Sequence, residues 1–264
     1  MKRRGLPLRS ASECHRIYAL NESYFDVIDT EEKAYWLGFI AADGCVYRDA
    51  LGVCLDEGDA EHLEKLRAAL ASEQPLRLLT DPRHGNRTSR LQIHSQRLTG
   101  GLMAAGIIPA KSFTLLPWAG PPELLRHYWR GVVDGDGSVG KDGRGEWFVR
   151  LVGSRAMAQG FADFVAERTG WQRKEARPHK TIWHVGYVGV SIPQAIATVL
   201  YKGATTFLDR KKATADELLA VVPLRKRLRL PRRKKRWRAC MHDSGIGRRS
   251  AGNWISPEPA WDGY

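Results

Sequence analysis

Two aspartates, each followed directly by glycine, are the residues of this sequence best suited to chemistry. Asp43 lies in the segment WLGFIAADG and Asp136 in WRGVVDGDG, and the two aspartates are 93 residues apart. Paired carboxylates bind hard divalent cations, which take oxygen ligands and support hydrolysis of phosphate esters. A single Asp-Gly is also typical of a simple turn. Two matched copies favour a site for Mg²⁺, or for another divalent cation such as Mn²⁺.

Small residues at helical spacing indicate how these aspartates are positioned. Gly38 and Ala42 precede the first, Gly131 and Gly135 precede the second, and four-residue spacing places each pair on one helix face. Small residues allow two helix backbones to approach closely, so we expect the two helices to pack against each other. Their ends would then bring the two carboxylates together.

That arrangement requires positive charge nearby. A helix C-terminus is already negative, and two like charges about 4 Å apart cost roughly 4 kcal/mol at an effective dielectric constant of 20. We therefore expect a cation at this point. We also expect Gly44 and Gly137 to end the helices with positive φ.

The segments that follow the two motifs also match in kind. Each half is predicted to run α-β-β-α-β-β-α, from hydrophobic periodicity and from alternating apolar runs. The expected fold is α+β, with two pseudo-symmetric halves and two four-stranded sheets. We assign residues 30–120 to the first half and 121–222 to the second. Residues 1–29 form a basic lead-in, and 223–264 form a basic tail.

Composition points to a polyanionic partner. The 264 residues carry a formal net charge of +13, which favours association with nucleic acid. Ten basic residues lie between Arg225 and Arg238, without an acidic one. The run is interpreted either as a solvated tail or as an arm that binds phosphates. Its candidate DNA contacts are Arg232, Arg233, Lys234 and Lys235.

Polar side chains on the predicted strands give a second set of DNA contacts. In TSRLQIHS, Arg90, Gln92 and His94 alternate with Leu91 and Ile93, so they share the face away from the core. An ordinary solvated face has the same pattern, but two such ribbons favour a surface that reads a DNA groove. The remaining candidates, in the first and second halves, are Arg77, Arg87, Arg173, Arg177 and Lys180.

The two motifs resemble the nine-residue signature of the LAGLIDADG homing endonucleases, in the two-motif, single-chain form of phage and bacterial members. The resemblance covers roughly residues 30–222. It implies that Asp43 and Asp136 are metal-binding and catalytic. The sixth motif position, Ala41 in the first copy and Asp134 in the second, is not the family's invariant ligand. Arg130 replaces the usual small second residue of the signature.

The same resemblance implies a basic catalytic residue near each carboxylate. Lys111 in IIPAKSFTL matches the first such position, and LDRKK offers Lys211 or Lys212 for the second, of which Lys211 is preferred. These groups would orient water and neutralise charge on the phosphate. The two sheets would form a saddle over the major groove. The implied activity is metal-dependent, site-specific cleavage of double-stranded DNA, with intron or element homing as its biological role.

A non-cleaving nucleic-acid binder of the same fold, such as an intron maturase or a transcription regulator, is the alternative. The four cysteines show no zinc or C-x-x-C spacing, and no apolar run suits a membrane span or a secretory signal. We therefore expect a monomer without membrane association in the cytoplasm of a bacterial host or a phage-infected cell. The ending WDGY lacks the His-Asn of an intein, which favours a free-standing enzyme.

Overall fold

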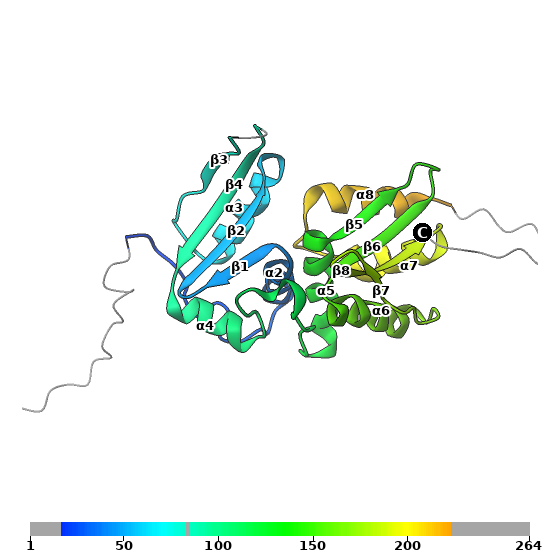
Figure 1. Ribbon diagram of the computed structural model, residues 1–264, viewed down its shortest axis with the longest axis horizontal. Coiled ribbons are helices and arrows are strands. Elements are labelled where there is room, and N and C mark those ends of the chain that lie inside the picture. The colour runs from blue at the N-terminus through cyan, green and yellow to red at the C-terminus, as the bar shows by residue number, and fades with distance from the viewer. Residues whose placement is uncertain (1–16, 83–84, 223–264) are drawn as a thin grey trace, which may run out of the picture. The chain divides into compact units, whose positions relative to one another are not determined.

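The computed structural model describes residues 17–82 and 85–222, which form two halves that share the order α-β-β-α-β-β-α (Figure 1). The first half consists of α2 (Glu31–Asp43), β1 (Gly44–Tyr47), β2 (Ala50–Asp56), η1 (Glu57–Asp59), α3 (Ala60–Ala69), β3 (Arg77–Thr80), β4 (Arg87–His94), α4 (Gln96–Ala104) and η2 (Lys111–Phe113). The second consists of α5 (Pro122–Asp136), β5 (Gly137–Lys141), β6 (Trp147–Gly153), α6 (Arg155–Thr169), β7 (Arg177–His179), β8 (Ile182–Val188), α7 (Ser191–Tyr201) and α8 (Asp209–Ala220).

Each half contains one four-stranded antiparallel sheet. The strand orders, β1-β2-β4-β3 and β5-β6-β8-β7, are equivalent. The predicted α+β class with two four-stranded sheets is therefore confirmed. Helix α8 extends the predicted pattern of the second half.

Alternation along the strands separates a core face from an open face. In β4, Leu91 and Ile93 are buried, whereas Arg90 and Gln92 are partly exposed and His94 is exposed. Strand β6 has the same pattern, with Val149 and Leu151 in the core. Each sheet therefore keeps one polar face away from the hydrophobic core.

Helices α2 and α5 form the most extensive contact between any two elements, and α2 also packs on β1 and β2 while α5 packs on β5 and β6. The helix pair consequently lies between the sheets (Figure 1). The α2 helix begins where the Thr30 hydroxyl accepts a hydrogen bond from Lys33 N, and Glu31 and Glu32 lie in its first turn. Both features favour helix initiation.

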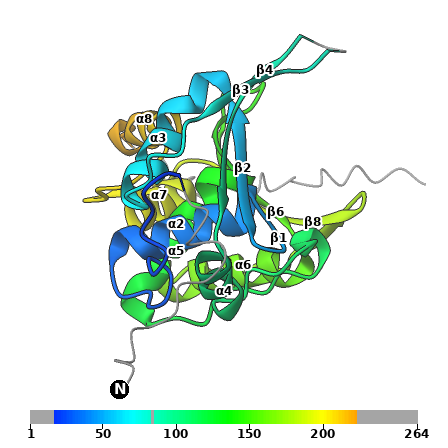
Figure 2. The ribbon, with the colours of Figure 1, turned by 90° about the vertical axis from the view of Figure 1, so that its left-hand side faces the viewer.

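Two further segments pack against the two halves. Tyr24 and Phe25, in the lead-in before Thr30, are buried in the first half. Helix α8 lies beside α3 (Figure 2), where Lys65 Nζ is 2.6 Å from Asp209 Oδ2 and Arg210 Nε is 2.8 Å from Asp59 Oδ2. The last described helix therefore links the second half to the first.

None of the described helices combines the length and the apolar run that crossing a bilayer requires.

Candidate active site

The two aspartates terminate the two central helices, which are in backbone contact. A Cβ added to Gly38 would lie 2.0 Å from the carbonyl oxygen of Tyr128, and one added to Gly131 would lie 2.1 Å from that of Tyr35. Near the helix ends, a Cβ on Gly135 would lie 2.4 Å from Ala42 Cβ. No side chain larger than hydrogen fits at these three glycines without moving a helix.

The prediction of positive φ at the two following glycines is wrong. Gly44 has φ −79° and Gly137 has φ −89°, and both continue directly into strands. Glycine is needed there for space, because an added Cβ would lie 2.6 Å from the carbonyl oxygen of Ile40 or of Val133. The chain thus turns from helix to strand without a left-handed residue.

The two carboxylates lie close enough to influence each other. Desolvation at the helix junction, followed by the charge of Asp136, raises the pKa of Asp43 to about 6. Desolvation also raises the pKa of Asp136. Both side chains nevertheless remain exposed on one side, so an ion from solution can reach them.

A lysine from outside the helix pair reaches the end of each central helix. Lys111 Nζ donates to the carbonyl oxygen of Ala42 at 3.0 Å. Lys211 Nζ donates to four carbonyl oxygens around the end of α5, at 2.6 to 3.1 Å. Both lysines are largely buried, with 8% and 5% of their surface exposed. By contrast, Lys212 Nζ pairs with Asp216 Oδ2 at 2.5 Å, on the outer side of α8.

Burial alters the acidity of both ammonium groups. Burial lowers the pKa of Lys111, against the opposing effect of Asp136. Burial lowers the pKa of Lys211 to about 8. These shifts follow from the cost of keeping a charge away from water.

Asp134, the carboxylate two residues before Asp136, is buried in the protein interior. Its oxygens accept hydrogen bonds from Tyr35 Oη at 2.8 Å, Tyr201 Oη at 2.6 Å and Leu208 N at 2.8 Å. With 1% of its surface exposed, it has no route to an ion in solution. This side chain joins α5 to α2 and α7.

Among the described residues, no cluster of three or more His, Cys, Asp and Glu side chains is arranged to hold a metal ion. A cation between Asp43 and Asp136 would therefore take its other ligands from water or from a bound phosphate. Mg²⁺ accepts this arrangement, since it binds through one or two carboxylates and keeps several waters.

The open face of the first sheet carries the predicted polar row. Arg77 and Arg90 are directly opposite each other in the β3–β4 pairing. Like charges in that position destabilise a sheet, and an anion bound there would relieve the repulsion. Gln92 Nε2 and His94 Nε2 are 3.0 Å apart on the same strand. Arg87 extends from the end of β4 and lies 2.9 Å from Glu57 Oε1.

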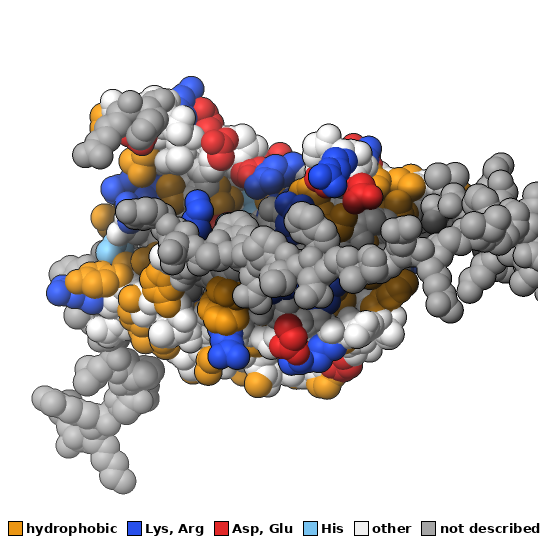
Figure 3. All heavy atoms as spheres, turned by 45° about the vertical axis from the view of Figure 1, so that its right-hand side comes forward, with side chains coloured by type: hydrophobic (Ala, Val, Ile, Leu, Met, Phe, Trp, Pro, Cys, Tyr) orange, Lys and Arg blue, Asp and Glu red, His pale blue; other side chains and the backbone are white. Residues whose placement is uncertain are grey.

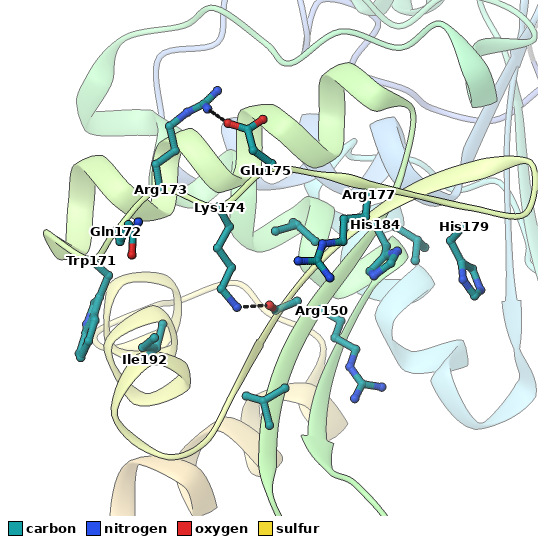
Figure 4. A pocket seen from close by; sticks show the side chains of 14 residues that line it. Arg150, Trp171, Gln172, Arg173, Lys174, Glu175, Arg177, His179, His184 and Ile192 are labelled. Atoms are coloured by element: carbon teal, nitrogen blue, oxygen red, sulfur yellow. Dashed lines mark hydrogen bonds and ion pairs between the residues drawn. The ribbon is translucent and has the colours of Figure 1, made fainter. Parts of the chain in front are cut away.

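The second sheet carries a groove with a volume of about 980 Å³ (Figure 4). Arg177 lies on β7, opposite His184 of β8. Arg150 of β6 also lines the groove, with its guanidinium 4.1 Å from the Phe148 ring centroid. A Cβ on the facing Gly186 would lie 3.1 Å from Arg150 Cγ, so glycine leaves room for this side chain.

In the second half, Arg173 and Arg177 were predicted to share one strand, QRKEARPH, with Lys180 at the turn that follows. The observed strand β7 is shorter, which changes the assignment of Arg173 alone. Arg173 precedes β7, and its Nε lies 2.5 Å from Asp163 Oδ1, with Glu175 as a second partner. It lines the groove while paired with two acidic side chains. Lys180 occupies the β7–β8 turn with φ 52°. Arg150 was not among the predicted DNA contacts, although alternation in EWFVRLVGS places it with Phe148 and Val152 on the open face of β6.

The predicted contacts Arg232, Arg233, Lys234 and Lys235 lie outside the described residues. On the visible face of the described part, Lys and Arg side chains (blue) lie among acidic (red) and apolar (orange) ones (Figure 3).

No protein-family model and no curated protein sequence matches the chain. Its fold is similar to that of LAGLIDADG meganuclease I-CpaMI bound to uncleaved DNA, with 9% identity, coverage of 73% of this chain and 90% of the other, and a TM-score of 0.48. Meganuclease I-SmaMI bound to uncleavable DNA is 13% identical, with coverage of 70% of this chain and 88% of the other, and a TM-score of 0.48. The N-terminal LAGLIDADG domain of DUF199/WhiA is 13% identical, with coverage of 68% of this chain and 89% of the other, and a TM-score of 0.46. These likenesses are distant, and the fold assignment rests on the sheets and helices described above.

Proposed function

We propose that this chain is a site-specific DNA endonuclease of the LAGLIDADG homing type, which hydrolyses a phosphodiester bond in each strand. The observation that carries the proposal is the pair of exposed aspartates, Asp43 and Asp136, at adjoining ends of two helices in backbone contact. Two carboxylates at negative helix ends cost stability. A bound divalent cation offsets that cost and supports nuclease chemistry.

Asp43 and Asp136 would hold Mg²⁺, or Mn²⁺ in its place. When bound, such an ion supplies Lewis-acid stabilisation of charge on the phosphate and lowers the pKa of a coordinated water. Desolvation raises the pKa values of both carboxylates, which indicates that their charged forms gain from a positive partner.

The lysines and the sheets have complementary tasks in this proposal. Lys111 and Lys211 place positive charge beside the carboxylates, where it favours binding of a phosphate. Arg77, Arg90 and Gln92 on one sheet, and Arg150 and Arg177 on the other, would contact bases and phosphates of duplex DNA. Because one chain contains both halves, the proposed enzyme acts as a monomer on double-stranded DNA.

A non-cleaving binder of the same fold would use the same polar faces but would gain nothing from the two aspartates. The facing Arg77 and Arg90 support anion binding in either case. Retention of both carboxylates at a junction where they repel each other supports cleavage. We place the enzyme in the cytoplasm of a bacterial host or a phage-infected cell, with element homing as its role.

The test compares the cleavage activity of Asp43→Asn and Asp136→Asn with that of the wild type. The substrate is a DNA duplex in which the sequences upstream and downstream of the coding region are joined directly, as in a locus without the proposed homing element. Each variant removes a metal ligand and no groove contact. We expect cleavage in Mg²⁺ to fall by at least about 100-fold, while DNA affinity stays near that of the wild type. EDTA should abolish cleavage by the wild type.

Asp216→Asn is the matched control, because it removes a carboxylate from the exposed side of α8, where its partner is Lys212. Its cleavage rate should stay at the wild-type level. Binding without any cleavage by the wild type would identify the chain as a non-cleaving binder. Normal cleavage by the double Asp43/Asp136 variant would exclude the proposed metal site.

A further inference from the structure

We propose that the two carboxylate–lysine pairs are unequal, so that the enzyme cuts one DNA strand well before the other, and that the pair Asp136–Lys111 makes the first cut. This inference rests on the proposed endonuclease function. It concerns how the two halves divide the reaction.

The pairs are formed across the two halves. Lys111, from the first half, lines a cavity of about 150 Å³ together with Asp136 and Ala42. Asp43 instead approaches the second half at Gly135, where an added Cβ would lie 3.2 Å from Asp43 Oδ2. Lys211 donates to the carbonyl oxygen of that same Gly135 at 3.1 Å. Each aspartate therefore lies beside the lysine of the other half.

The two lysines differ in the number of N–H groups left for a substrate. An ammonium group has three donors. The four acceptors of Lys211 Nζ are the carbonyl oxygens of Val133, Asp134, Gly135 and Gly137, at 2.8, 2.6, 3.1 and 2.7 Å. All three of its donors are engaged by the end of α5. Lys211 can bind water or phosphate only by releasing the helix that it stabilises.

Lys111 keeps donors for that purpose. Within the described part of the chain, its Nζ has one hydrogen-bond acceptor, the carbonyl oxygen of Ala42 at 3.0 Å. Two N–H groups are left beside the cavity, which has room for several water molecules. Lys111 is thus able to orient a water molecule or a phosphate oxygen next to Asp136 without losing its contact with α2.

The same reaction occurs on both strands. A water oxygen forms a bond to phosphorus, the water gives up a proton, and one bridging P–O bond breaks. The departing oxygen takes up a proton to become a hydroxyl group. A free ammonium donor beside the phosphate favours this step, because negative charge grows on the phosphate and on the departing oxygen. The half-site with Lys111 should therefore react faster than the half-site with Lys211.

The experiment follows each strand separately. The full-length protein and Mg²⁺ are mixed with a supercoiled plasmid that carries the joined flanking DNA, and with a linear duplex that has a different fluorophore on each strand. We expect nicked circles to accumulate before linear DNA, with strand rates that differ by at least about 10-fold. Lys111→Met should slow the faster strand by about 100-fold, the loss typical of one stabilising donor, and should leave the slower strand unchanged.

Lys211→Met tests the other half of the inference. It should not change which strand is cut first, because Lys111 still acts on the faster strand. It should lower the melting temperature in EDTA without DNA by about 5 °C, whereas Lys111→Met should lower it less. If Lys211→Met does not fold, Lys211→Arg replaces it, because a guanidinium group keeps donors for the α5 carbonyl groups.

The outcomes separate the inference from the proposed function. Equal strand rates in the wild type would overturn the inference alone, as would a Lys211→Met variant that loses one strand's cleavage while keeping its melting temperature. If the wild type cuts neither this plasmid nor a plasmid library with randomised sites, in Mg²⁺ or in Mn²⁺, the endonuclease function itself fails.

Discussion

The two central helices, α2 and α5, both end in aspartate, but the side chains on their buried flanks differ. Leu37 and Ala41 of α2 are apolar and buried. The equivalent positions of α5 hold Arg130 and Asp134, which are just as deeply buried, at 0% and 1% exposure. The duplicated motif therefore preserves the small contact residues and the terminal aspartate, while the buried flank differs in its chemistry.

The buried charges of α5 are stable because distant elements supply partners. Arg130 donates to Glu31 Oε1 at 2.9 Å, to the Thr206 carbonyl at 2.8 Å and to the Leu200 carbonyl at 3.0 Å. A buried charge without such partners costs several kcal/mol. The first half has no need of these partners, because its flank is apolar. The comparison indicates that both helices require the small residues at their contact and the aspartate at their end, whereas the chemistry of the buried flank can differ.

The strongest test of the close contact between α2 and α5 is Gly131→Leu. A leucine there would require α2 and α5 to separate, because even a Cβ would lie 2.1 Å from the Tyr35 carbonyl oxygen. We expect a loss of more than about 4 kcal/mol in the free energy of unfolding, near the upper end for one substitution. Thermal and denaturant unfolding measure it.

Gly100→Leu in α4 provides the matched control, since no atom lies within 4 Å of an added Cβ. It should change the stability by no more than about 1 kcal/mol, and in the stabilising direction, because leucine favours helix over glycine. Equal effects of the two substitutions would mean that the glycines of the helix pair are not required for close packing.

Local patterns in the sequence predicted the repeated architecture well. Alternation in TSRLQIHS indicated which face of β4 is polar, and the four-residue spacing of Gly131 and Gly135 indicated which face of α5 meets its partner. These features depend on neighbouring residues of one element, whose period fixes the direction of each side chain.

Features that depend on distant partners were not predictable in the same way. Asp134 accepts hydrogen bonds from Tyr35, 99 residues away, and from Tyr201, 67 residues away, and no local pattern links these three. Arg173 was expected on a strand, but it precedes β7 and forms an ion pair with Asp163 of α6. The burial of Phe25 depends on the close approach of Gly101 in α4.

Replacing Asp134 by alanine tests whether the buried flank of α5 can be apolar, as the buried flank of α2 is. In Asp134→Ala, the hydroxyl groups of Tyr35 and Tyr201 and the amide of Leu208 would lose their acceptor. At roughly 1 kcal/mol for each unsatisfied group, we expect a loss of about 3 kcal/mol. Asp134→Asn keeps an acceptor oxygen and should lose about 1 kcal/mol. A stability equal to the wild type in Asp134→Ala would show that the network contributes nothing to holding the halves together.

The smallest expected effect concerns the helix ends, where the two halves are alike. The pKa of Asp43 is raised from 3.8 to about 6, so the folded protein favours the protonated carboxyl. The resulting stability is fully present below the unfolded pKa of 3.8 and is lost as the pH rises through about 6. Asp43→Asn removes the charge. In EDTA at pH 7.5 it should therefore be more stable than the wild type, by about 1 kcal/mol after allowance for solvent screening.

Denaturant unfolding in EDTA at pH 5 and pH 7.5 measures this difference, which should shrink at the lower pH because the wild-type carboxyl is then largely protonated in the folded state. Adding Mg²⁺ at pH 7.5 should stabilise the wild type and not the variant, since the proposed site would require both carboxylates to hold the ion. Asp216→Asn removes an equal charge from the surface of α8 and should show neither response. A variant less stable than the wild type at pH 7.5 would mean that Asp43 makes a favourable contact in the metal-free protein, and that the repulsion between the two helix ends does not limit its stability.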